Sequence, residues 1–83
     1  MQPFNFNPLQ LTLSRNVKAA RKARGLSQER LALEAEVDRT YVSQIERAVS
    51  NPSLLVVAKI AAVLDTEVAV LLSEEIPKIQ LAI

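Results

Sequence analysis

Apolar residues recur at helical spacing along most of this chain. Leu13, Val17 and Ala20 form the first clear stripe, and Gly25 is a suitable C-terminal stop for the helix that carries them. Similar stripes predict further helices over residues 28–35, 39–48, 54–64 and 67–73. No alternation typical of strands occurs before the C-terminal tail. The sequence therefore predicts an all-α fold, a compact bundle of five short helices.

Short polar residues mark the expected starts of three helices. Ser27, Asp38 and Ser53 each precede an apolar stripe, and their side-chain oxygens can accept hydrogen bonds from the free N–H groups of a first helical turn. Only residues 36–38 separate the second helix from the third. Two short helices joined by so tight a turn are typical of a helix-turn-helix, in which the second helix places its N-terminal residues in the major groove of DNA.

The two ends of the chain lack this regularity. Residues 1–11 contain two prolines and are expected to be an irregular lead-in, although Asn7-Pro8 is also suited to begin a helix. Residues 12–73 are expected to hold the helix-turn-helix domain. The apolar segment 74–83 ends in a period-two alternation that fits either a short strand or a disordered tail.

The absence of Cys and His restricts the chemistry of this chain. Without Cys there is no disulfide, thiolate metal site or cysteine nucleophile, and without His the commonest general base is missing. The remaining Ser, Thr, Asp and Glu side chains have no His partner and no glycine-rich loop. We therefore expect a binding protein and not an enzyme, with no catalytic residue, no metal and no cofactor. A chain of 83 residues also leaves no room for a separate ligand domain, so no small-molecule effector is expected.

The formal net charge of +1 conceals an uneven distribution. Residues 1–47 hold eight basic and five acidic side chains, and residues 48–83 hold two basic and four acidic ones. The first part thus carries +3 and the second −2. This division is typical of a polyanion-binding half joined to a half with another role, although a solvated helix face explains the basic run at 15–24 equally well.

No targeting or membrane-spanning segment is evident in the sequence. The first ten residues lack the basic region and apolar core of a signal peptide. The longest apolar stretch, 54–64, is interrupted by Lys59 and is too short to cross a bilayer. We expect a cytoplasmic protein with no membrane partner.

Three motifs in a fixed order carry a resemblance to a known family. They are GLSQERLA at 25–32, VDRTYVSQIER at 37–47 and NPSL at 51–54. At these spacings the chain resembles the phage-repressor/Cro-type helix-turn-helix family of bacterial regulators, over about residues 13–72. The stretch 38–47 is also similar to the controller proteins of restriction–modification systems. The resemblance implies a lambda-repressor-like DNA-binding domain that acts in transcription regulation.

The resemblance also implies roles for residues on both helices of the motif. Positions that contact bases in the family match Arg39, Thr40, Ser43 and Gln44, and positions that contact the sugar–phosphate backbone match Gln28, Tyr41 and Arg47. Tyr41 could instead pack against the preceding turn. Ser27 needs only its capping role, with phosphate contact as an optional second one. Arg21 matches a base that pairs with Glu46 and braces the first helix against the third.

Two acidic residues depart from the family pattern. Glu36 occupies a position that is usually Gly between the motif helices, and Asp65 replaces a frequent Gly after the fourth helix. The backbone at the first position is commonly left-handed, where a non-glycine residue costs on the order of 1 kcal/mol. The departure at Glu36 also places an acid near the expected DNA-facing side.

The apolar C-terminal part predicts an interface. It carries more apolar surface than a domain of this size can bury, and exposed apolar patches usually mark interfaces. We expect a two-fold homodimer through the fifth helix and the C-terminal segment, unless the tail folds back on its own core. The expected contacts are Val68, Leu71, Leu72 and Ile79.

Two hypotheses for function follow. The first is a sequence-specific transcriptional regulator that binds double-stranded DNA as a homodimer, with recognition helices about 34 Å apart on an inverted-repeat operator. The alternative is a protein-interaction module such as an antitoxin, which uses the apolar C-terminal face. Binding that weakens steeply with salt would indicate phosphate contacts and favour the first hypothesis.

Overall fold

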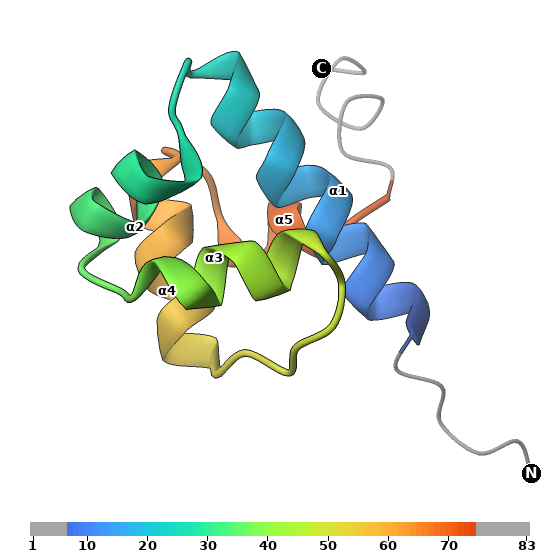
Figure 1. Cartoon of the computed structure of the whole chain (residues 1–83). Coiled ribbons are helices and arrows are strands. Elements are labelled where there is room, and N and C mark those ends of the chain that lie inside the picture. The colour runs from blue at the N-terminus through green and yellow to red at the C-terminus, as the bar shows by residue number, and fades with distance from the viewer. Residues whose placement is uncertain (1–6, 75–83) are drawn as a thin grey trace, which may run out of the picture.

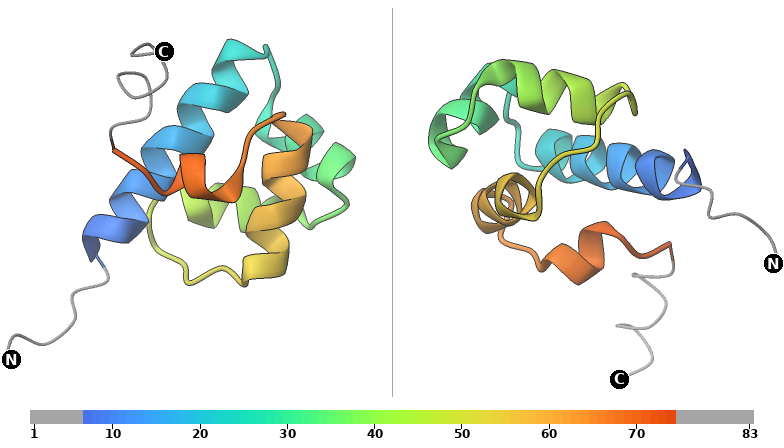
Figure 2. Two further views of the ribbon diagram at one scale, coloured as in Figure 1. Left: turned by 180° about the vertical axis from the view of Figure 1, so that it is seen from behind. Right: turned by 90° about the horizontal axis from the view of Figure 1, so that it is seen from below.

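A computed structural model describes residues 7–74 of the chain (Figure 1). Its helices are α1 (Asn7–Ala23), α2 (Gln28–Ala35), α3 (Arg39–Glu46), α4 (Leu54–Val63) and α5 (Val68–Leu71). The part of the chain described here contains no strand, which confirms the predicted all-α class. Figure 2 shows α2 and α3 on one side of the molecule and α5 on the opposite side, with α1 and α4 between them.

The predicted N-caps are confirmed in atomic detail. The Ser27 hydroxyl accepts a hydrogen bond from the Arg30 backbone N–H, and the Asp38 carboxylate accepts one from the Thr40 N–H. The Ser53 hydroxyl caps α4 in the same way. Each cap satisfies a backbone N–H that has no partner inside its helix, so these residues set where α2, α3 and α4 begin.

Helix α1 corrects one sequence-based boundary. It begins at Asn7, so residues 7–11 belong to a helix and not to the irregular lead-in expected over 1–11. Pro8 is tolerated because the first turn of a helix needs no N–H donor. Gln10 adds a tertiary contact, since its side-chain amide donates to the Ser50 carbonyl oxygen at 2.8 Å.

Helices α3 and α5 are also shorter than predicted. Helix α3 ends at Glu46, ahead of the predicted residue 48, because Ala48 adopts a left-handed backbone with φ of 59°. Helix α5 covers only Val68–Leu71 of the predicted 67–73. Of the expected C-terminal segment, residues 75–83 lie outside the described residues, and the predicted interface residue Ile79 lies there too.

The hydrophobic core joins side chains from every helix. Leu31, Val42 and Ile60 have no exposed surface, which anchors the helix-turn-helix to α4. Leu71 is only 2% exposed and packs in this same core. Its predicted place in a dimer interface is therefore corrected, because a side chain buried within its own protomer cannot contact a second one. Val68 and Leu72 are only partly buried.

Among residues 7–74, three non-glycine residues just after helices have a left-handed backbone: Glu36 at φ 59°, Ala48 at φ 59° and Asp65 at φ 56°. The left-handed backbone at positions 36 and 65 was expected, because the family frequently has Gly at both. At Glu36 the backbone N–H donates to the carbonyl oxygens of Ala32 and Leu33, which closes α2. The tight turn into α3 is thus built on a strained acidic residue.

Candidate nucleic-acid interface

Helix α3 presents a polar face to solvent and an apolar face to the core. Val42 and Ile45 are buried, which fixes how the helix is rotated. Because helical neighbours follow at intervals of three or four residues, the intervening polar residues turn outward. Of the predicted base- and backbone-contacting residues on this segment, four are exposed and two are half-buried: Arg39, Thr40, Tyr41 and Arg47, and Ser43 and Gln44.

The start of α3 is held by a charged cap. Hydrogen bonds from the side chain and the backbone N–H of Thr40 hold the pKa of Asp38 below its ordinary value. The carboxylate is therefore ionised at neutral pH, and it sits at the positive end of the helix, where a negative charge is favourable. This fixes the first turn of α3, from which Arg39 and Thr40 project.

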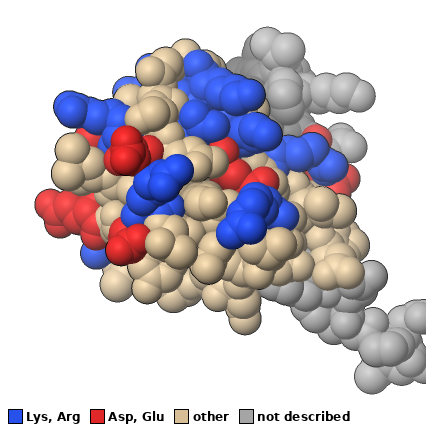
Figure 3. Space-filling view, viewed as in Figure 1, with Lys and Arg blue, Asp and Glu red and all other residues tan. Residues whose placement is uncertain are grey.

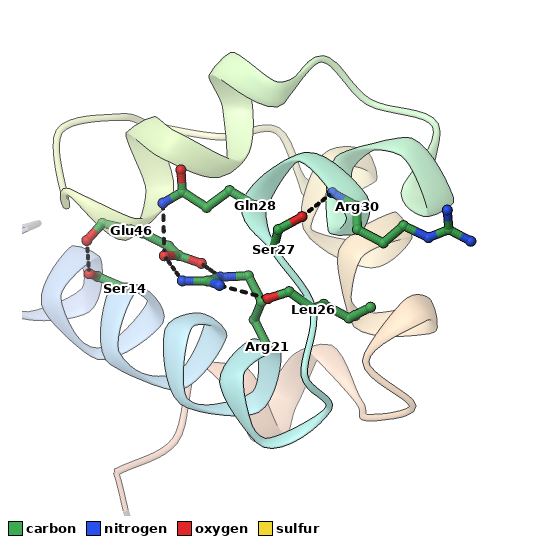
Figure 4. Close-up of polar contacts among 7 residues, drawn as sticks. All are labelled: Ser14, Arg21, Leu26, Ser27, Gln28, Arg30 and Glu46. Atoms are coloured by element: carbon green, nitrogen blue, oxygen red, sulfur yellow. Dashed lines mark hydrogen bonds and ion pairs between the residues drawn. The ribbon is translucent and has the colours of Figure 1, made fainter.

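The end of α3 is held by a buried ion pair with α1. Arg21 Nε and Nη2 donate to the two carboxylate oxygens of Glu46 at 2.6 and 2.9 Å (Figure 4). The third donor, Nη1, reaches the Leu26 carbonyl oxygen at 2.8 Å. The side chains of the pair are only 11% and 2% exposed. Such bidentate, charge-assisted contacts fix geometry as well as charge, so α3 and α1 have a defined relative position.

Two further polar contacts converge on Glu46. The Ser14 hydroxyl donates to its backbone carbonyl oxygen at 2.6 Å, and the Gln28 amide nitrogen donates to its Oε1 at 3.0 Å. Burial acts to raise the pKa of Glu46, but the hydrogen bonds from Arg21 and Gln28, with the charges of Arg21 and Lys18, outweigh it and place that pKa below its ordinary value. Glu46 is thus a charged acceptor at the junction of α1, α2 and α3.

Basic side chains gather around this arrangement. Figure 3 shows Lys and Arg over α1 and α3 on the face that carries α3, and acidic side chains toward α2. Arg30 is engaged by Glu34 in an exposed pair on α2 at 2.7 Å, and such pairs contribute little stability. Glu36 is exposed in the turn between the motif helices, so the positive surface has an acidic edge there.

An apolar groove lies beside α5, bounded by the start of α1, the loop between α3 and α4, and the start of α4. It has a volume of about 180 Å³ and is lined by Leu9, Leu13, Leu54, Val57, Val68 and Leu72, among others. Leu54 is 72% exposed and Leu9 37%. Two of the predicted dimer residues, Val68 and Leu72, therefore border a larger apolar surface than α5 alone provides.

Residues 7–74 contain no group of three or more acidic side chains placed to hold a metal ion. Among the helices that the structure describes, none combines the length and apolarity that a membrane span requires.

The fold and this surface define the class of protein: two short capped helices at a tight turn, with the second helix exposed and braced from behind, form a helix-turn-helix domain. A family model described as "Helix-turn-helix" matches residues 17–71. The chain belongs to this family, which confirms the resemblance stated on sequence motifs.

Two relatives illustrate the match. The immunity repressor protein of Bacillus phage phi105 is 38% identical over 65 residues, which cover 78% of this chain and 45% of the repressor. The transcriptional regulator SinR of Bacillus subtilis (strain 168) is 41% identical over 64 residues, which cover 76% of this chain and 58% of SinR. The chain therefore spans about half the length of these relatives.

Solved structures agree with the sequence matches. The restriction–modification controller protein C.AhdI from Aeromonas hydrophila superposes with a TM-score of 0.71 at 39% identity, covering 75% of this chain and 94% of C.AhdI. SinR in complex with DNA superposes with a TM-score of 0.70 at 40% identity, covering 74% of this chain and 98% of that one. SinR has also been solved in complex with the protein SinI.

Three features of this site are not evident from the sequence. The hydrogen bond between Gln28 and Glu46 joins side chains 18 residues apart, and no local pattern encodes it. The left-handed Ala48 gave no signal because Ala is a strong helix former. Leu9 was not expected to line the groove, because residues 1–11 were predicted to be an irregular lead-in and not part of a helix.

Proposed function

We propose that this chain is a sequence-specific DNA-binding transcriptional regulator. The observation that carries the proposal is the exposed polar face of α3, held at both ends by the Asp38 cap and the Arg21–Glu46 pair. A recognition helix must enter the major groove in one fixed orientation, and this bracing supplies it. The relatives named as an immunity repressor and as transcriptional regulators, and the SinR–DNA complex, support the same function.

Contacts to DNA divide by residue type in this proposal. Arg39 and Gln44 carry planar groups that match guanine O6/N7 and adenine N6/N7, and Thr40 and Ser43 complete the base-contacting set. Contacts to phosphate come from Gln28, Tyr41 and Arg47, and from Ser27 in addition to its capping role. No group in this scheme performs catalysis, and no cofactor takes part.

Substitutions on α3 test the proposal directly. Arg39→Ala and Gln44→Ala should each weaken binding by about 1–3 kcal/mol and relax preference at one base position. Arg47→Ala is the matched contrast, because loss of a phosphate contact weakens binding to all sequences alike and lowers the salt dependence. Unchanged sequence preference in both Arg39→Ala and Gln44→Ala would refute the base contacts.

A homodimer on an inverted-repeat operator completes the proposal. The groove beside α5 supports it, since Leu9, Leu54, Val68 and Leu72 offer an apolar surface to a second copy. Two-fold symmetry would set the recognition helices about 34 Å apart, one turn of DNA. Sedimentation at micromolar concentration tests this step, and a single species at the 9.2 kDa monomer mass would exclude the dimer.

A second candidate function is a protein-interaction module, of which an antitoxin is an example. The same apolar groove favours it, as does the complex of SinR with SinI. Salt separates the two candidates. DNA affinity should fall steeply as salt rises because counterions are released from phosphates, whereas an apolar protein interface should be nearly insensitive to salt.

A further inference from the structure

We propose that Glu46 is a positioning residue for DNA binding: it orients the Gln28 side chain so that one N–H of its amide faces a DNA phosphate. This inference rests on the proposed function and deepens it, because it assigns a second role to an acid that otherwise only braces α3 against α1. Glu46 itself contacts no DNA in this scheme and acts through Gln28.

The geometry places the Gln28 amide against a fixed point. Glu46 Oε1 accepts from both Gln28 Nε2 at 3.0 Å and Arg21 Nη2 at 2.9 Å, and Oε2 accepts from Arg21 Nε at 2.6 Å. The Glu46 side chain is 2% exposed, and its backbone carbonyl is tied to the Ser14 hydroxyl. A carboxylate fixed by two hydrogen bonds from Arg21 on α1 cannot follow the amide, so the amide must follow the carboxylate.

The chemistry of the amide then fixes which atom faces DNA. A carboxylate only accepts hydrogen bonds, so Gln28 must turn its nitrogen toward Glu46, and Figure 4 shows its oxygen pointing away from the ion pair. The nitrogen carries two hydrogens, of which Glu46 takes one. The other remains for an acceptor at the N-terminus of α2, where backbone N–H groups and the helix dipole also favour an anion.

Charge neutralisation makes this arrangement compatible with a nearby phosphate. An unpaired carboxylate behind Gln28 would repel the DNA backbone. Arg21 offsets that charge through two hydrogen bonds. The side chain of Gln28 therefore loses rotational freedom before DNA arrives, without a net negative charge being placed behind the phosphate.

The test compares two uncharged replacements of the ion pair. Arg21→Met/Glu46→Gln keeps one acceptor oxygen at position 46, and Arg21→Met/Glu46→Met keeps none. The two variants have equal net charge, and neither leaves a buried charge unpaired. Affinity for a random-sequence 30-base-pair duplex at low salt is the readout, since that binding depends on phosphate contacts.

We expect the Glu46→Gln version to bind several-fold more tightly than the Glu46→Met version. The two should share the same salt slope, because the uncharged Gln28 amide neutralises no phosphate and so releases no counterion. The difference should vanish when Gln28→Ala is added to both. A difference that persists without the Gln28 amide, or two variants of equal affinity, would overturn the positioning role. Absence of any salt-dependent binding by the unmodified chain would overturn the proposed function itself.

A measurement on the unmodified chain keeps the proposal testable if either variant fails to fold. Side-chain amide relaxation by NMR should give Gln28 an order parameter near that of rigid backbone, about 0.85, whereas a freely rotating side chain falls below about 0.6. A Gln28 amide as mobile as a free one would contradict the orientation by Glu46.

Discussion

Replacing Glu36 by glycine should stabilise this domain. Glu36 has φ of 59° and ψ of 43° in the turn between α2 and α3. A side chain in this region costs roughly 1–2 kcal/mol because Cβ approaches the following carbonyl oxygen. Glycine removes that contact, but it also gains about 0.5–1 kcal/mol of conformational entropy in the unfolded chain. The net gain expected for Glu36→Gly is therefore about 0.5–1 kcal/mol relative to Glu36→Ala.

The alanine variant is the essential comparison. Glu36→Ala removes the same negative charge from the C-terminal end of α2 but keeps Cβ, so the difference between the two variants reports the backbone strain less the unfolded-state entropy of glycine. Ala58 supplies a second control, since it is exposed within α4 and Ala58→Gly should lose about 1 kcal/mol. The preference between Gly and Ala should thus reverse between positions 36 and 58.

Urea unfolding followed by circular dichroism measures these differences, and thermal unfolding should show a rise of roughly 2–8 °C for Glu36→Gly over Glu36→Ala. If the glycine variant is no more stable than the alanine variant, the strain argument fails. In that case the left-handed backbone at Glu36 would be as favourable for Ala as for Gly.

Three further predictions concern the core and the ion pair. Arg21→Met should lower the free energy of unfolding by about 3–5 kcal/mol, because it leaves Glu46 buried and unpaired. The double variant Arg21→Met/Glu46→Met should recover most of that loss. An equal loss of stability in the single and the double variant would contradict this. Because the pKa of Glu46 is lowered by folding, its contribution to stability should be complete above its ordinary pKa of 4.5 and disappear as pH falls through its folded-state pKa. The urea midpoint of the unmodified chain should therefore fall relative to that of the double variant as pH drops below 4.5, and a constant difference between the two would contradict this. Leu71→Ala should lower the free energy of unfolding by about 2–5 kcal/mol. Leu55 is exposed, so Leu55→Ala should change it by no more than about 0.5 kcal/mol. Similar effects at both positions would show that α5 is not part of the core.

Local features of the fold were predictable because their causes are local. Ser27, Asp38 and Ser53 cap helices through hydrogen bonds to residues two or three positions ahead, so sequence alone places those helix starts. The left-handed backbone at Glu36 and Asp65 followed from comparing positions with a family pattern. The polar face of α3 followed from helical periodicity.

The remaining features depend on contacts between distant segments. Helix α1 starts at Asn7, where tertiary contacts such as that of Gln10 with Ser50 favour order, and periodicity within the segment does not reveal them. The burial of Leu71 likewise depends on how α5 packs against the core. An apolar pattern shows that a helix buries one face, but it does not show which of its residues stay available to a partner.

Selection of bound sequences from a random DNA pool tests the central claim most directly, since it reports binding, half-site sequence and half-site spacing together. A DNA-binding regulator that acts as a two-fold dimer predicts enrichment of an inverted repeat with half-site centres about 10 base pairs apart. Arg39→Ala and Gln44→Ala should each lose preference at one position of the half-site. A pool that stays unenriched after repeated rounds would contradict the account.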